Sequence, residues 1–152
     1  MSNATRPQPS KTDGLTLSSE RLQQVLARDA TTQPREWMES LNEALLQVEK
    51  GLRKYLIVAD SPVGPQAEIE KNSPRLARKM DGVCKGFGDY LEQSIALREE
   101  VRRLTVSMNP AASDLAALRQ LAEQFLDELE HIRDTESELI LESANTELGA
   151  GD

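Results

Sequence analysis

Glu128 and His131, which stand three residues apart, give the sequence its clearest candidate for metal chemistry. A carboxylate and an imidazole at this spacing lie on the same face of a helix, where both can bind one metal ion. His131 is followed five residues later by Glu136, a second carboxylate with suitable chemistry. We therefore take His131 and Glu136 as candidate metal ligands, with Glu128 as the alternative carboxylate.

The segment that carries these residues, from Leu118 onward, resembles the last helix of hemerythrin-like cation-binding domains, and His131 and Glu136 match the spacing of that family's ligands. The resemblance implies a four-helix bundle with a non-haem di-iron centre that binds oxygen or senses oxygen, iron or redox state. Such a centre takes several histidines from other helices, whereas His131 is the single histidine of this chain. The resemblance thus implies a relative that has lost the metal site, and we expect no cofactor.

Both candidate ligands also have an interpretation without metal. Acidic residues surround His131, which is typical of a solvated helix face. Glu136 falls at the next inward position after Ile132, and a buried carboxylate needs a partner. We expect an arginine from a neighbouring helix, Arg98 or Arg102, to pair with it.

Other catalytic groups are hard to assemble from this sequence. Cys84 is the single cysteine, so an intrachain disulfide and a zinc site with several thiolates are both excluded. It follows Val83 on the apolar side of its segment, which predicts a buried and unreactive thiol. No Ser/His/Asp grouping stands out. We predict no catalytic residues and a protein that is not an enzyme.

Length and charge limit the partners. A chain of 152 residues is long enough for one domain with a sizeable core. The formal charge of −8 opposes binding to phosphate backbones, so nucleic acid is not an expected partner. No apolar run is long enough to cross a membrane. With one cysteine and no signal-peptide pattern, we expect a cytoplasmic protein.

Apolar residues recur at steps of three and four along one short and three long segments, the pattern of amphipathic helices. We predict helices over residues 18–30, 33–59, 74–106 and 113–145. Ser18 or Ser19 is expected to cap the first, and Ser73 with Pro74 to start the third. The polar stretch up to Asn72 is expected to be a connection.

These segments predict an all-α fold, an antiparallel four-helix bundle with three long helices and one short N-terminal helix. The helical-bundle domain is expected to span residues 15–145. Residues 1–14 and 146–152 contain few large apolar side chains and are predicted to be flexible tails.

Gly82, Gly86 and Gly88 fall within the third predicted helix, where glycine costs about 1 kcal/mol relative to alanine. Three interpretations stay open. A neighbouring helix approaches closely, the helix bends, or the glycines leave room for a ligand.

For function, we expect a non-enzymatic helical-bundle protein that acts through protein contacts or self-association. Near-heptad stripes can pair between chains as well as within one, so a homodimer is an expected form. The alternative is a small-molecule or metal-binding sensor of the hemerythrin-like type, with iron as the cofactor.

Overall fold

The computed structural model of the protein describes residues 13–59, 62 and 65–150. The described residues form five helices and no β-strand, so the predicted all-α fold class is confirmed. The helices are α1 (Asp13–Leu26), α2 (Pro34–Ala59), α3 (Pro65–Asn72), α4 (Pro74–Val106) and α5 (Ala112–Ala150).

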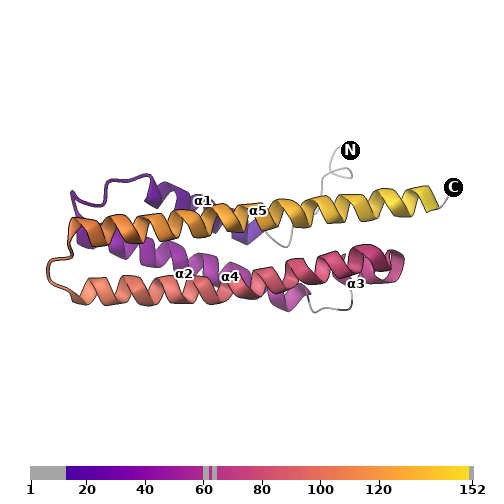
Figure 1. Ribbon diagram of the computed structural model, residues 1–152, viewed down its shortest axis with the longest axis horizontal. Coiled ribbons are helices and arrows are strands. Elements are labelled where there is room, and N and C mark those ends of the chain that lie inside the picture. Colours follow the sequence, from indigo (N-terminus) through magenta and orange to yellow (C-terminus); the bar gives the residue numbers. More distant parts are fainter. Residues whose placement is uncertain (1–12, 60–61, 63–64, 151–152) are drawn as a thin grey trace, which may run out of the picture.

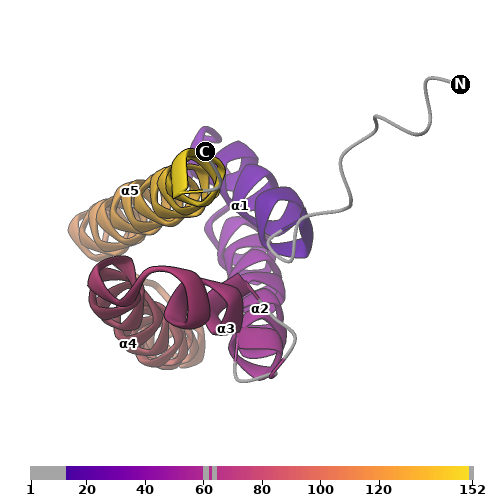
Figure 2. The same ribbon diagram turned by 90° about the vertical axis from the view of Figure 1, so that its right-hand side faces the viewer.

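The helices pack side by side into an elongated molecule (Figure 1). α2 packs between α1 and α4, and α5 packs against α4 and α1, so that these four helices enclose one core. Figure 2, a view along the long axis, shows this arrangement, with the short α3 at one end. α3 contacts α4 and α5.

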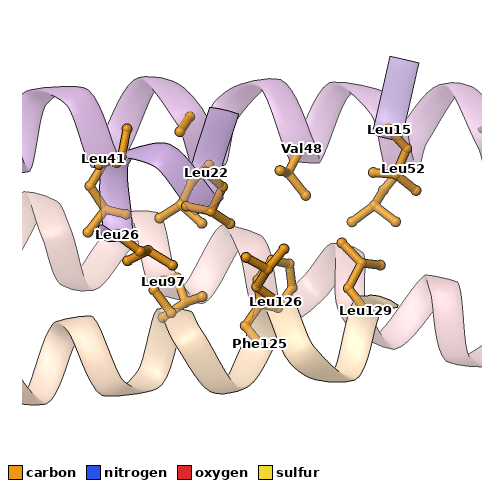
Figure 3. Close-up of a cluster of buried hydrophobic side chains, with 14 of the residues drawn as sticks. Leu15, Leu22, Leu26, Leu41, Val48, Leu52, Leu97, Phe125, Leu126 and Leu129 are labelled. Carbon is orange, nitrogen blue, oxygen red and sulfur yellow. The ribbon is translucent and has the colours of Figure 1, made fainter. Parts of the chain in front are cut away.

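The core is built mainly from leucine, with valine, alanine and a few aromatic rings. The stripe predicted for α2 is buried from Trp37 to Tyr55, and most of the stripes predicted for α4 and α5 are buried as well. Figure 3 shows part of this core, where leucines of α1 and α2 gather opposite Leu126 and Leu129 of α5. Helical periodicity therefore identifies the inward faces correctly.

The start of α1 (Asp13–Leu26) lies upstream of the predicted helix, 18–30. Leu15 is 1% exposed and packs against Gly51 of α2, which extends the helix toward the N-terminus. The prediction of a cap at Ser18 or Ser19 is wrong. Both serines are buried inside the helix, and the Ser18 hydroxyl donates to the Leu15 carbonyl at 3.0 Å.

Side chains from other helices end α1 earlier than predicted. The indole Nε1 of Trp37 donates to the Val25 carbonyl at 3.0 Å. The Arg119 guanidinium donates to the carbonyls of Leu26 and Arg28 and lies over the Trp37 ring, 5.1 Å from its centroid. These contacts supply donors to carbonyl groups at the C-terminal end of α1, where the Val25 carbonyl also accepts from the backbone N–H of Arg28 at 3.1 Å. The chain therefore turns at this point.

The prediction of a connection up to Asn72 is wrong, because α3 occupies this stretch. Ile69, which is 2% exposed, holds α3 against the core. One large apolar side chain in eight residues produces no helical period, which is why the sequence pattern misses α3. The fold therefore has two short helices rather than one.

The remaining helix ends follow the predictions more closely. Ser73 and Pro74 start α4 as predicted, although the Ser73 side chain makes no capping hydrogen bond. α5 continues to Ala150, past the predicted end at residue 145, so 146–150 are helical. Residues 13 and 14 of the predicted N-terminal tail belong to α1. The rest of both predicted tails lies outside the described residues.

The glycines of α4 have different surroundings. A Cβ added at Gly86 would overlap Cδ1 of Ile132 on α5, whereas one added at Gly82 or Gly88 would meet nothing within 4 Å. The interpretation of a close helix approach is therefore correct at Gly86, and it does not extend to the other two glycines.

Candidate functional site

The structure places His131 and Glu136 on different faces of α5. His131 is exposed, whereas Glu136 is 4% exposed and points into the core. Five residues correspond to about 140° around a helix, so the two side chains diverge. The solvated position predicted for His131 and the inward position predicted for Glu136 are both correct. The spacing alone does not bring the two together.

Glu128 lies one turn before His131 and is half-buried beside the Phe125 ring at the α4–α5 contact. Its carboxylate accepts a hydrogen bond from the Gln124 amide at 3.5 Å. Among the described residues, no three side chains of the His, Cys, Asp or Glu type cluster in a way that could hold a metal ion. The metal ligands proposed from the sequence stay a prediction.

The buried Glu136 carboxylate accepts a hydrogen bond from the hydroxyl of Tyr55 on α2. The expected partners were Arg98 and Arg102, and this prediction is wrong. Arg98 pairs with Glu49 at 2.8 Å, and Arg102 lies 3.7 Å from Glu99 on its own helix. The Tyr55 ring stacks at a tilt on Phe87, with 4.2 Å between centroids, which fixes the position of its hydroxyl.

A second buried carboxylate, Glu49 of α2, is 8% exposed and receives two arginines. Arg98 of α4 donates to it at 2.8 Å, and Arg53 donates at 3.2 Å. Burial alone would raise the pKa of Glu49, but the hydrogen bonds from Arg98 and Arg53 hold this pKa below its ordinary value. This cluster joins α2 to α4. Helical periodicity does not identify this cluster, because Glu49 directly follows the inward residue Val48.

Cys84 is half-buried and packs against the core. The prediction of a buried thiol is therefore correct only in part. Cys84 lies toward the edge of the apolar stripe that Val83 and Phe87 mark on α4.

A groove, here named the α4–α5 groove, lies between α4 and α5. It has a volume of about 370 Å³. Its floor is formed by the buried side chains of Leu97 and Phe125, which Figure 3 shows at the contact of the two helices. Ala96 of α4 and Leu121 of α5 line its sides. Leu121 is 50% exposed.

Polar groups surround this apolar surface. Gln93 and Glu100 lie on the α4 side, and Gln124 and Glu128 lie on the α5 side. Arg103 donates to Glu100 at 3.0 Å, and this hydrogen bond lowers the pKa of that carboxyl. The groove lining therefore contains two carboxylates and no basic side chain.

Tyr90 of α4 contacts Phe125 of the groove floor. Its ring meets the Phe125 ring edge-on, with 6.1 Å between centroids. Burial raises the pKa of Tyr90, and the charges of Glu128 and Asp89 raise it further. The phenol therefore stays protonated at neutral pH and can donate a hydrogen bond.

Leu121 was not among the residues predicted to have a role, although the sequence contains a signal for it. Leu121 stands beside Ala122, which belongs to the inward stripe of α5, and it forms an outward row with Ala117 one turn earlier. A second apolar row next to a core stripe indicates a surface that a partner can cover.

Comparisons with protein-family models, curated proteins and solved structures found no match. The hemerythrin-like resemblance therefore rests on the residues of the last helix alone. Within the described part of the chain, no helix has the length and apolar character needed to cross a membrane.

Proposed function

We propose that this protein is an antiparallel four-helix bundle that works by binding a partner protein in the α4–α5 groove, and that it does so without catalysis. The observation that carries the proposal is the half-exposed Leu121 beside an apolar floor made by Leu97 and Phe125. Apolar surface that stays in contact with water favours association, because covering it removes that contact.

The dimensions of the groove fit an amphipathic helix. Its lining extends from Gln93 to Glu100 on α4 and from Leu121 to Glu128 on α5. Seven residues correspond to about 10 Å of helix, or two turns of a docked partner. A helix inserts two or three apolar side chains into such a groove at positions i, i+3 or i+4, and i+7.

Charge favours a basic partner helix. The groove lining contains Glu128 and also Glu100, which is paired with Arg103, and the whole chain carries a formal charge of −8. A helix with an apolar stripe flanked by lysine or arginine complements this surface, whereas an acidic helix is repelled. A second copy of the chain presents the same two carboxylates, so self-association through this groove is less favourable than binding a basic helix.

Binding of model helices tests this proposal. The probe is a fluorescent peptide of about 18 residues built from leucine and lysine at helical spacing, and a leucine and glutamate peptide of the same pattern is the comparison. We expect the lysine peptide to bind and Leu121→Gln to weaken it roughly tenfold. Leu17→Gln is the matched control, because Leu17 is a 68% exposed leucine on α1.

Two outcomes contradict the proposal. The contact would be non-specific if both peptides bound equally well. It would also be non-specific if Leu17→Gln lowered the affinity for the lysine peptide as much as Leu121→Gln does. A dimer in sedimentation that dissociates with Leu121→Gln would assign the groove to a second copy instead.

A further inference from the structure

A second groove, here named the α1–α2 groove, lies between α1 and α2 near the start of α1. It has a volume of about 390 Å³. Gly14 of α1 and Gly51 of α2 line it, and neither has a side chain to fill the seam between the helices. A Cβ added at Gly14 would meet nothing within 4 Å, whereas one added at Gly51 would lie 3.3 Å from the Leu15 Cα. The two helices therefore touch at Gly51 and leave a groove beside their contact.

Large apolar side chains are exposed along this groove. Leu17, which is 68% exposed, lines it from α1. Ile57 of α2 is 73% exposed and stands seven residues after Lys50, a lining residue, so both lie on the same face of α2. Apolar surface of this kind favours association, because covering it removes its contact with water.

The charged groups of the α1–α2 groove are basic. Arg21 of α1 and Lys50 and Lys54 of α2 line it, and no acidic side chain among the described residues does. Within the same residues, none of these three cations forms an ion pair. This local positive charge lies on a chain whose formal charge is −8. The groove therefore suits a helix that carries both apolar and acidic side chains.

The C-terminal part of α5 is such a helix, and it projects at one end of the molecule (Figure 1). Leu141, which is 62% exposed, stands three residues after Glu138 and seven after Asp134, so the three share one helix face. Both of these carboxylates are exposed, and neither forms an ion pair with a described residue, whereas Glu142 pairs with Arg75. No lysine or arginine follows Asp134 in α5.

These two surfaces lie at the same end of the bundle. The Arg133 guanidinium donates to the hydroxyl of Thr16, which places this part of α5 level with the start of α1. Figure 2 shows α1 between α5 and α2, so the surfaces lie on either side of α1. One copy can therefore place its α5 in the groove of a second copy while it receives the α5 of that copy. Such a reciprocal contact closes around a two-fold axis and gives a dimer.

Length and charge both favour this occupant. The α1 side of the groove extends from Gly14 to Arg21, and the acidic face of α5 extends from Asp134 to Leu141. Each covers seven residues, or about 10 Å of helix. Residues 1–12 precede the groove in the chain, but they contain two basic residues and no acidic one, so their charge opposes binding there.

We propose that the α1–α2 groove binds the C-terminal part of α5 of a second copy, and that the protein thereby forms a reciprocal dimer. Leu141 of one copy packs against Leu17 of the other. Asp134 and Glu138 pair with the three cations of the groove. The contact does not involve the α4–α5 groove, so this proposal stands independently of the function proposed above.

Sedimentation equilibrium of the whole protein tests the dimer. We expect a monomer–dimer equilibrium with a dissociation constant of about 1–100 μM, because each contact extends over only about two helical turns. Leu17→Gln is expected to raise this constant about tenfold or more. Leu121→Gln, which changes a 50% exposed leucine outside the contact, is expected to leave it unchanged.

Charge reversal identifies the two surfaces. Lys50→Glu combined with Lys54→Glu is expected to give a monomer, because like charges then face each other. Asp134→Lys combined with Glu138→Lys is expected to give a monomer for the same reason. A mixture of these two variant proteins is expected to dimerise again. The reversed groove of one then meets the reversed α5 of the other, and the second contact has its original charges.

The control is Arg78→Glu combined with Lys79→Glu, which makes the same change of net charge at exposed positions of α4 and should leave the dimer intact. A wild type that stays monomeric up to about 500 μM would overturn the proposal. So would a dimer that Leu121→Gln or the control dissociates as much as Leu17→Gln does. A mixture of the two charge-reversed proteins that stays monomeric would overturn it as well.

Discussion

The hydroxyl of Tyr55 donates a hydrogen bond to the buried carboxylate of Glu136, and so joins α2 to α5 diagonally across the core. Neither side chain reaches solvent appreciably, since Tyr55 is 0% and Glu136 is 4% exposed. A buried hydrogen bond of this kind contributes to the specificity of helix packing, because any other register leaves a carboxylate without this donor.

Replacing Tyr55 with phenylalanine is expected to lower the free energy of unfolding by about 1–3 kcal/mol, because the buried Glu136 carboxyl loses a hydrogen bond while the ring packing on Phe87 is kept. Urea denaturation measures this change. Tyr90→Phe is the control, since Tyr90 is only half-buried. A loss in Tyr90→Phe equal to that in Tyr55→Phe would contradict the role given to Tyr55.

The Glu49 cluster makes stability depend on pH. The pKa of Glu49 is lowered in the folded state from its ordinary value of 4.5, so the unfolded chain takes up its proton first as the pH falls. The contribution of Glu49 is therefore present above pH 4.5 and lost as the pH falls through the lower, folded pKa. We expect Glu49→Gln to lower stability by about 1–2 kcal/mol at pH 7 and by much less at pH 3.

The control for Glu49 is Glu142→Gln, which removes an exposed ion pair with Arg75. Exposed pairs of this kind contribute about 0–1 kcal/mol, so this variant should behave almost as wild type at both pH values. A difference between wild type and Glu49→Gln that does not change with pH would contradict the account of this cluster.

The glycines of α4 provide a matched comparison. Gly82→Ala is expected to raise the free energy of unfolding by about 0.5–1 kcal/mol, because the added Cβ enters open space and alanine favours the helix. Gly86→Ala is expected to gain less or to destabilise, because Ile132 must move to admit the methyl group. Thermal unfolding of both variants measures the difference. A larger gain for Gly86→Ala would contradict the close approach of α4 and α5.

Metal content tests the ligands proposed from the sequence. His131 and Glu136 diverge on α5, so we expect purified protein to hold iron, zinc and manganese far below one equivalent. His131→Ala should leave that content unchanged. Elemental analysis of both proteins is the measurement, and near-stoichiometric iron that disappears with His131→Ala would restore the hemerythrin-like interpretation.

The spacing of apolar residues, together with the proline and serine residues at the helix ends, predicts α2 and α4 almost to the residue. The same spacing predicts that Glu136 faces inward. It does not predict which side chain meets Glu136. That choice depends on the axial register between helices, which a single sequence does not determine. An arginine was expected from charge alone, whereas the register brings Tyr55 to this level and leaves Arg98 beside Glu49.

The ends of α1 illustrate a second limit. The helix ends where Trp37 and Arg119 reach its carbonyl groups, and these residues lie on two other helices. A contact between distant segments carries no local sequence signal. For the same reason, the α4–α5 groove becomes recognisable only when Leu97 and Leu121 are seen to share one surface.

The most direct test of partner binding in the α4–α5 groove is an NMR titration of isotope-labelled protein with the leucine and lysine peptide. We expect chemical shift changes to concentrate at residues 93–100 of α4 and 121–128 of α5, and to be much smaller in Leu121→Gln at the same peptide concentration. Changes centred on α1 and α2, or changes of equal size in Leu121→Gln at the same peptide concentration, would contradict it.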